Sequence, residues 1–405
     1  MARSFPKKNF KKGKGSWKSR SSKTFEVKVP QVLFSWRQPA PADARACIAL
    51  WPSEEEYDTY FDPFLGSGLG WTHAGQHADR LFVNDRNNEY ISAMRLVSKG
   101  EPNVIEYFRK WLRILGVLDA WPENNLQKCL AFHVEHFGSY VKDDVNVLRK
   151  KMANLVLMTC HTLFNIQEKE FNFQTAFFRQ VVEASLVGVM KKSFDMALLN
   201  GEPLPPETLV NELSKAMRSA GFVYIKQLYM NSLRVDAYSN PYHVMLYVVL
   251  NSVGRKDESG SWKLAAPVKF SDYEKDFRPF ESPLVHALGY RTNFIHNEAA
   301  SFLLNNVGGA SSFTFAKVPS SYPEVSVGGL YDILWKRPGL FLMIAAAEKV
   351  KNISHRESRK TFTDSKGREL VALANYVLPG EDESESPQVN NISDSDFDTP
   401  PDFSC

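Results

Sequence analysis

The chain has 405 residues, of which 43% are hydrophobic and 13% aromatic, and its formal net charge is +3. No run of residues approaches the roughly 18 to 20 apolar residues that a membrane span needs, and no apolar segment follows the basic N-terminus as in a signal peptide. The four cysteines lack CxxC spacing, which favours reduced thiols in an intracellular protein over a disulfide framework.

Residues 1–28 form a basic arm with ten Lys or Arg and one acid, a net charge of +9. Low apolar content and high charge predict that this arm is disordered without a partner. Its cations can neutralise phosphates, and its aromatic rings offer faces on which single-stranded bases stack. A solubilising or targeting leader is the alternative interpretation. The candidate nucleic-acid-binding residues of the arm are Lys7, Lys8, Lys11, Lys12, Lys14, Trp17, Lys18, Arg20 and Lys23.

Residues 29–379 form the body, for which we predict a mainly α fold with a few short strands, because long segments show helical spacing of apolar residues. A short strand is expected to start near Phe25. The Pro, Gly and Trp residues of 36–75 then predict a long irregular segment. Apolar residues at spacings of three and four predict helices at 103–120, 143–166, 172–199 and 205–221.

The second half of the body is expected to continue this pattern. The apolar run at 242–250 fits either a buried strand or a buried helix, and its periodicity does not decide between them. Residues 251–282 are polar and form a predicted surface excursion. Two more helices are expected at 284–304 and 340–350, with a connection rich in Ser, Gly and Pro at 308–329.

Residues 380–405 carry eight acids and no base, which predicts a disordered acidic tail of charge −8. Because the whole chain carries +3, the part between arm and tail has a net charge of only +2. Ser393 and Ser395 are each followed by Asp and are possible phosphorylation sites. An unmodified solubilising tail is the alternative.

The sharpest local string is Asp62-Pro63-Phe64-Leu65-Gly66-Ser67-Gly68. It resembles the cofactor loop of amino-methyltransferases, in which Asp-Pro-Phe and Gly-x-Gly lead from a buried strand into a helix. The resemblance implies that the loop binds S-adenosylmethionine. It also implies that Asn240-Pro241-Tyr242 corresponds to the catalytic Asn/Asp-Pro-Pro-Tyr element of those enzymes. The acidic residues before the string and the Gly-containing segment after it predict neither strand nor helix, and the second motif lacks a proline. We therefore expect a Pro/Gly surface loop.

Two histidine pairs have the spacing of metal ligands on a helix, His73 with His77 and His133 with His136. Neither pair has the glutamate beside its first histidine that a zinc hydrolase helix shows, so we interpret all four as structural residues. No Ser-His-Asp or Cys-His arrangement and no P-loop can be read. The sequence thus predicts no catalytic residue, no metal site and no cofactor.

In its size, composition and order of parts the chain resembles coat proteins of plant and fungal RNA viruses, especially the capsid subunits of partitiviruses. This resemblance implies a mostly α subunit that forms dimers, which close into an icosahedral shell around RNA. The Lys-rich arm fits equally well the nucleoprotein of a negative-strand RNA virus, which coats RNA as a helical filament.

These observations predict a non-enzymatic coat (capsid) protein of the virion and host cytoplasm. It would assemble with itself, package RNA through the basic arm and have no membrane partner. The alternatives are a negative-strand virus nucleoprotein and a cellular nucleic-acid methyltransferase that uses the 62–68 loop. Particle formation by the purified chain supports a coat protein, whereas S-adenosylmethionine binding supports the methyltransferase.

Overall fold

The computed structural model describes residues 34, 39–137, 145–159, 175–233, 239–256, 262–264, 281–353 and 358–379. Most of these residues are helical, and the described strands form a seven-stranded sheet and a two-stranded sheet. The expectation of a mostly helical protein with some strands is therefore confirmed. The basic arm, the acidic tail and the strand expected near Phe25 lie outside the described residues.

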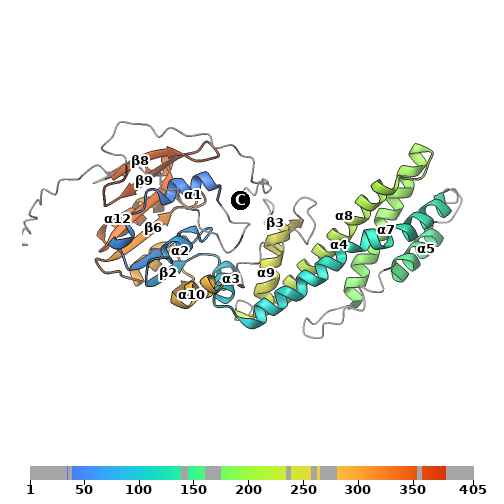
Figure 1. Ribbon diagram of the computed structural model, residues 1–405. Coiled ribbons are helices and arrows are strands. Elements are labelled where there is room, and N and C mark those ends of the chain that lie inside the picture. Colours follow the sequence, from blue (N-terminus) through green and yellow to red (C-terminus); the bar gives the residue numbers. More distant parts are fainter. Residues whose placement is uncertain are drawn as a thin grey trace, which may run out of the picture.

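Two stretches of the chain, far apart in sequence, build an α/β unit that we call the sheet domain (Figure 1). Its strand order is β5-β2-β1-β6-β7-β9-β8. The five strands from β5 to β7 are parallel, and β9 is antiparallel to both of its neighbours. The strands are β1 (Thr59–Asp62), β2 (Arg80–Asn84), β5 (Thr292–Ile295), β6 (Ser312–Lys317), β7 (Leu340–Ala346), β8 (Ser358–Thr363) and β9 (Glu369–Ala374).

Helices cover both faces of this sheet, so its central strands are apolar on both sides. Consecutive residues point to opposite faces: Tyr60 belongs to one apolar core and Phe61 to the other. The core around Tyr60 includes residues of α2 (Leu69–Ala74) and α3 (Asn88–Ser98). The core around Phe61 includes residues of α11 (Ala299–Asn305) and α12 (Glu324–Lys336).

A helical domain is inserted into the sheet domain between α3 and α10 (Pro283–Arg291), and Figure 1 shows its long helices extending away from the sheet. The helices bury aromatic rings against one another, among them Trp111, Phe194 and Tyr224. The inserted elements are α4 (Pro102–Phe137), α5 (Val145–Thr159), α7 (Thr175–Asn200), α8 (Pro206–Ser232), α9 (Pro241–Val253), β3 (Gly254–Lys256) and β4 (Trp262–Leu264).

The four helices predicted first correspond to α4, α5, α7 and α8, but two of them are longer than expected. Gly221 does not end α8, because Ala220 and Phe222 beside it are buried and packing holds the helix together through the glycine. The undecided run at 242–250 is helical. The Asn240 side chain caps this helix by accepting the Tyr242 N–H at 3.0 Å.

Predictions for the sheet domain were less successful. The expected helix at 340–350 is strand β7 followed by the 3-10 turn η6 (Ala347–Val350), and the expected helix at 284–304 is α10, β5 and α11. The segment 36–75, expected to be irregular, contains α1 (Pro41–Ile48), β1 and α2, and the connection at 308–329 contains β6. A strand that is buried on both faces has no alternation of apolar and polar residues, so periodicity did not reveal it.

Candidate functional site

The chain leaves β1 and β6, which are neighbours in the sheet, in opposite directions. The connection through α2 leads from β1 to β2 on one side, and the connection through α12 leads from β6 to β7 on the other. In open α/β sheets ligands bind outside the carboxyl ends of the strands at such a switch point. The carboxyl edge of β5, β2, β1 and β6 is therefore the candidate site.

The loop after β1 lies between a buried strand and a helix, which the sequence did not predict. All four residues of β1 are buried, and the loop at 63–68 runs directly into α2. Gly66 and Gly68 have φ values of +54° and +77°, in the left-handed region that favours glycine. A Cβ at Gly68 would also lie 3.3 Å from Cε of Met94. The prediction of a plain surface loop is wrong, because a short buried strand precedes the glycines and a helix follows them.

The Asp62 carboxyl group is the most perturbed acid at this edge. It is 2% exposed, accepts a hydrogen bond from the Tyr60 hydroxyl at 3.0 Å, and accepts the Phe64 N–H at 3.1 Å. Burial raises the pKa of Asp62 to about 7 against the lowering effect of these hydrogen bonds, and the nearby charge of Asp85 raises it further. Near neutral pH this buried carboxyl group therefore exchanges between its neutral and anionic forms.

Asn84, the last residue of β2, joins the loops of three strands. Its Nδ2 donates to the carbonyl oxygens of Pro63 and Asn297, both at 3.0 Å, and the main-chain carbonyl of Asn84 accepts the Leu65 N–H at 2.8 Å. Within the part of the chain that the structure describes, nothing donates to the buried Asn84 Oδ1. The edge thus contains a buried acceptor to which no described residue donates, and such acceptors are uncommon in native structures.

Asp85 follows β2 directly, and its carboxylate accepts the Asn87 N–H at 2.7 Å. In dinucleotide-binding folds an acid about 20 residues after the Gly-x-Gly loop binds ribose hydroxyls. Asp85 has this spacing from Gly66 and stands at the matching strand end. The sequence analysis missed it, although an apolar run ending in Asn-Asp at this distance was a readable signal.

The loop after β6 completes the edge with Val318-Pro319-Ser320-Ser321-Tyr322. Tyr322 meets the ring of Phe64 edge-on at 5.1 Å, and the Lys349 ammonium donates to carbonyls of this loop, including that of Tyr322 at 2.6 Å. Burial raises the pKa of Tyr322, with a further contribution from Glu298. The loops after β1 and β6 are therefore packed together at the switch point.

The structure does not bring the 240–242 motif to this edge. Asn240 caps α9 in the helical domain, and the ring of Tyr242 packs against Tyr107 of α4 at 5.9 Å. The motif is a helix start, and it stands on no strand next to β1.

The paired histidines have structural contacts. His73 packs against Trp51 at 4.9 Å, burial lowers its pKa to about 4, and His77 contacts Glu54 at 2.8 Å. His133 accepts the Leu204 N–H at 3.0 Å, and His136 packs edge-on against Phe132 at 4.5 Å. Across the described ranges no three His, Cys, Asp or Glu side chains gather in a group that could hold a metal.

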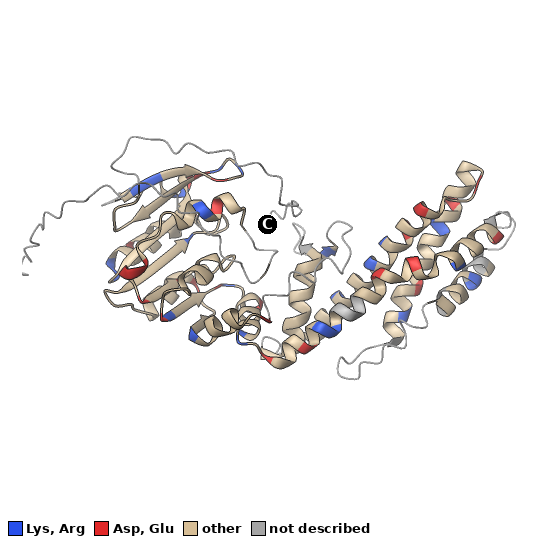
Figure 2. Ribbon diagram, in the orientation of Figure 1, with Lys and Arg blue, Asp and Glu red and all other residues tan. Residues whose placement is uncertain are grey.

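The nine candidate nucleic-acid-binding residues of the arm and the two candidate phosphorylation sites lie outside the described residues. In the body both signs of charge occur along α4, α7 and α8, as Figure 2 shows. Among the helices that the structure describes, none is long and apolar enough to cross a membrane. No protein-family model matches the chain, and no curated protein is detectably similar to it.

Proposed function

We propose that the sheet domain binds S-adenosylmethionine at the carboxyl edge between β1 and β6, and that the chain acts as a nucleic-acid methyltransferase. One observation carries this proposal. A buried strand leads through Asp-Pro-Phe-Leu-Gly-Ser-Gly into a helix, within a mostly parallel sheet whose antiparallel strand β9 lies between β7 and the edge strand β8. This strand order is typical of methyltransferases that use S-adenosylmethionine.

The residues at the edge fit such a cofactor. The Asp85 carboxylate would accept hydrogen bonds from ribose hydroxyls, and the buried Asn84 Oδ1 is an acceptor to which none of the described residues donates. The loop at 63–68 exposes Gly66, whose missing side chain lets a ligand approach the backbone. When bound, S-adenosylmethionine supplies an electrophilic methyl group.

The acceptor side differs from the amino-methyltransferase pattern. The catalytic element of those enzymes begins with Asn or Asp, whereas the loop after β6 begins with the apolar Val318 and keeps only the first proline, Pro319. Tyr322 stands one residue later than the tyrosine of the pattern. We therefore assign cofactor binding to the edge and assign no residue to the methyl-accepting step.

Nucleic acid is the proposed substrate because of the basic arm. Its net charge of +9 allows it to release counterions from phosphates, so that affinity falls steeply as the salt concentration rises. The helical domain contacts α3, the helix that begins just after Asp85, and this contact places the domain beside the cofactor edge. A nucleic acid held by the arm and the helical domain would lie near the proposed cofactor.

A coat protein or viral nucleoprotein remains a second candidate, favoured by the oppositely charged ends. In that case the chain would assemble with itself, package RNA and reside in the virion and host cytoplasm. It would form particles or filaments visible by negative-stain electron microscopy. The methyltransferase proposal predicts that such assemblies are absent from protein that binds the cofactor.

Calorimetric titration of the full-length protein with S-adenosylmethionine tests the proposal. We expect saturable binding with one cofactor per chain, and loss of binding in Gly68→Ala, whose new side chain needs an unfavourable φ and meets Met94. Gly309→Ala is the matched control, because its Cβ would meet nothing within 4 Å. Absence of binding to the folded wild-type protein would refute the proposal.

A further inference from the structure

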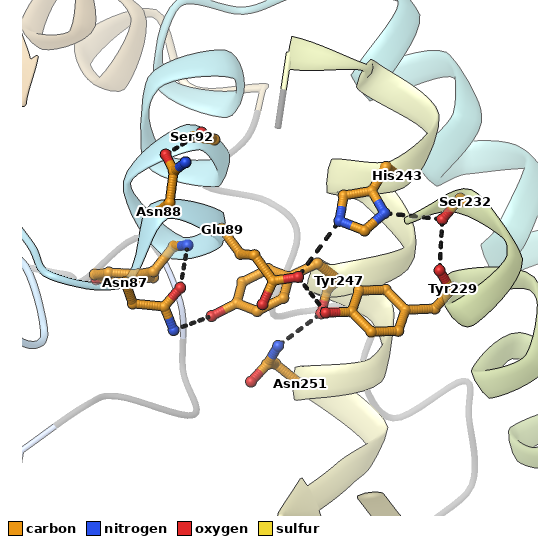
Figure 3. Close-up of polar contacts among 10 residues, drawn as sticks. Asn87, Asn88, Glu89, Ser92, Tyr229, Ser232, His243, Tyr247 and Asn251 are labelled. Carbon is orange, nitrogen blue, oxygen red and sulfur yellow. Dashed lines mark hydrogen bonds and ion pairs between the residues drawn. The ribbon is translucent and has the colours of Figure 1, made fainter. Parts of the chain in front are cut away.

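The first turn of α3 follows the Asp85 loop directly, and the helical domain holds it through two polar contacts (Figure 3). Asn87 caps α3 by accepting the Tyr90 N–H at 3.0 Å. The Nδ2 of the same asparagine lies 3.4 Å from the Tyr247 hydroxyl of α9. One side chain therefore fixes the start of α3 and also contacts the inserted domain.

The second contact is made by Glu89. Its carboxylate accepts a hydrogen bond from the Tyr229 hydroxyl of α8, and the same oxygen lies 3.4 Å from His243 Nε2 of α9. His243 is fully buried, and the rings of Tyr229 and His243 stack with centroids 5.0 Å apart. Glu89 is thus a carboxylate of the sheet domain that contacts Tyr229 and His243 of the inserted helices.

Ser232 sets the orientation of the imidazole. The Ser232 hydroxyl lies 2.8 Å from the Tyr229 carbonyl, to which it donates, and 2.8 Å from His243 Nδ1. The hydroxyl proton goes to the carbonyl, and the contact with Nδ1 holds that side of the imidazole against Ser232. This arrangement turns Nε2 toward Glu89 and keeps it there.

We propose that Glu89, Tyr229 and His243 are positioning residues that hold the loop 85–88 in its cofactor-binding position, so that the helical domain sets cofactor affinity. The inference deepens the proposed function and rests on it for the identity of the cofactor. Its physical basis is that one partly buried cluster joins α8 and α9 to the turn that follows Asp85. Removing one partner takes a hydrogen bond from a partly buried polar group of this cluster, which weakens the attachment of the turn to the inserted helices.

The test uses Tyr229→Phe and Glu89→Gln, both of which keep the shape of the side chain. Tyr376→Phe is the control. It also removes a partly buried tyrosine hydroxyl, but this hydroxyl donates to the Leu50 carbonyl at 2.6 Å, a contact that includes no residue of α3, α8 or α9. Hydrogen exchange of peptides that cover 85–92 reports on the loop without any ligand. Calorimetry with S-adenosylmethionine reports on the site.

Both cluster variants should exchange hydrogen in 85–92 about 10-fold faster than the wild type and bind the cofactor about 10-fold more weakly, while Tyr376→Phe changes neither. Unchanged exchange in both variants, or an equal change in the control, would overturn the proposal. If the wild type binds no S-adenosylmethionine, the proposed function fails, and the exchange data still decide whether the cluster holds the loop.

Discussion

Replacing Asp62 by Asn should remove a pH dependence of stability that originates in this one carboxyl group. The amide oxygen can still accept the Phe64 N–H, and the amide N–H can donate to the Tyr60 oxygen, so the packing is kept. The folded-state pKa of about 7 lies above the ordinary value of 3.8. The folded state therefore binds the proton more tightly, and the resulting stabilisation is complete below the unfolded pKa and lost as pH rises through 7.

The size of the effect follows from the pKa difference. Each pKa unit corresponds to about 1.4 kcal/mol, and about two units separate pH 5 from the folded-state pKa. Between pH 5 and pH 8 the wild type should therefore lose about 3 kcal/mol of stability through Asp62 that the variant does not lose. Other groups titrate in the same range, but they do so in both proteins and cancel in the difference.

Urea unfolding of both proteins at pH 5, 6, 7 and 8 measures this difference. The free energy of unfolding of the variant minus that of the wild type should rise by about 3 kcal/mol across the series, with most of the change below pH 7. A difference that stays constant with pH would show that Asp62 is ionised in the folded protein throughout, and the account of its burial would be wrong.

Three further outcomes are expected. Gly68→Ala should lower the free energy of unfolding by about 1 to 2 kcal/mol, because residue 68 has a positive φ. Gly309→Ala should change this free energy little, and urea unfolding measures both variants. Deleting residues 1–24 should remove most RNA affinity and flatten its salt dependence in a fluorescence titration, and an unchanged salt slope would exclude the arm as the binding element. Deleting residues 380–405 should raise affinity for a short labelled RNA at low salt, since the tail, with its charge of −8, competes with RNA for the basic arm. Equal affinities of the full-length and the tail-less protein would show that the tail is a solubiliser only.

Much of the helical domain was predictable because α4 and α8 are long and amphipathic. Residues such as Val104, Phe108 and Trp111 recur at helical spacing and are buried in the structure. Helix ends were less predictable: α4 passes through Pro122 and α8 through Gly221, since tertiary packing outweighs the local cost of these residues.

The sheet domain was not predictable from periodicity. Strand β7 sends Leu342 into one core and Met343 into the other, so its sequence is a continuous apolar run that reads equally well as a helix. Strand β1 has only four residues and follows an acidic 3-10 turn, η2 (Glu54–Glu56). So short an apolar segment beside three glutamates does not predict a strand. Without a recognisable strand before it, the 62–68 string predicts only a surface loop.

Contacts between distant segments could not be read from the sequence at all. Glu89 and His243 are more than 150 positions apart, and only the insertion of the helical domain brings them together. Asp85, by contrast, could have been found from the sequence, because its distance from the Gly-x-Gly loop is a local signal. Hydrophobic periodicity does not detect this signal, since the signal is a spacing between a glycine loop and an acidic residue.

Photo-crosslinking tests the central claim most directly. The full-length protein is irradiated with S-adenosylmethionine labelled in its methyl group, with and without excess S-adenosylhomocysteine, and the labelled peptides are mapped. The account predicts label that the competitor removes, in peptides covering 62–68 or 84–88 at the carboxyl edge of β1 and β2. Label confined to the helical domain, or no label that the competitor removes, would contradict it.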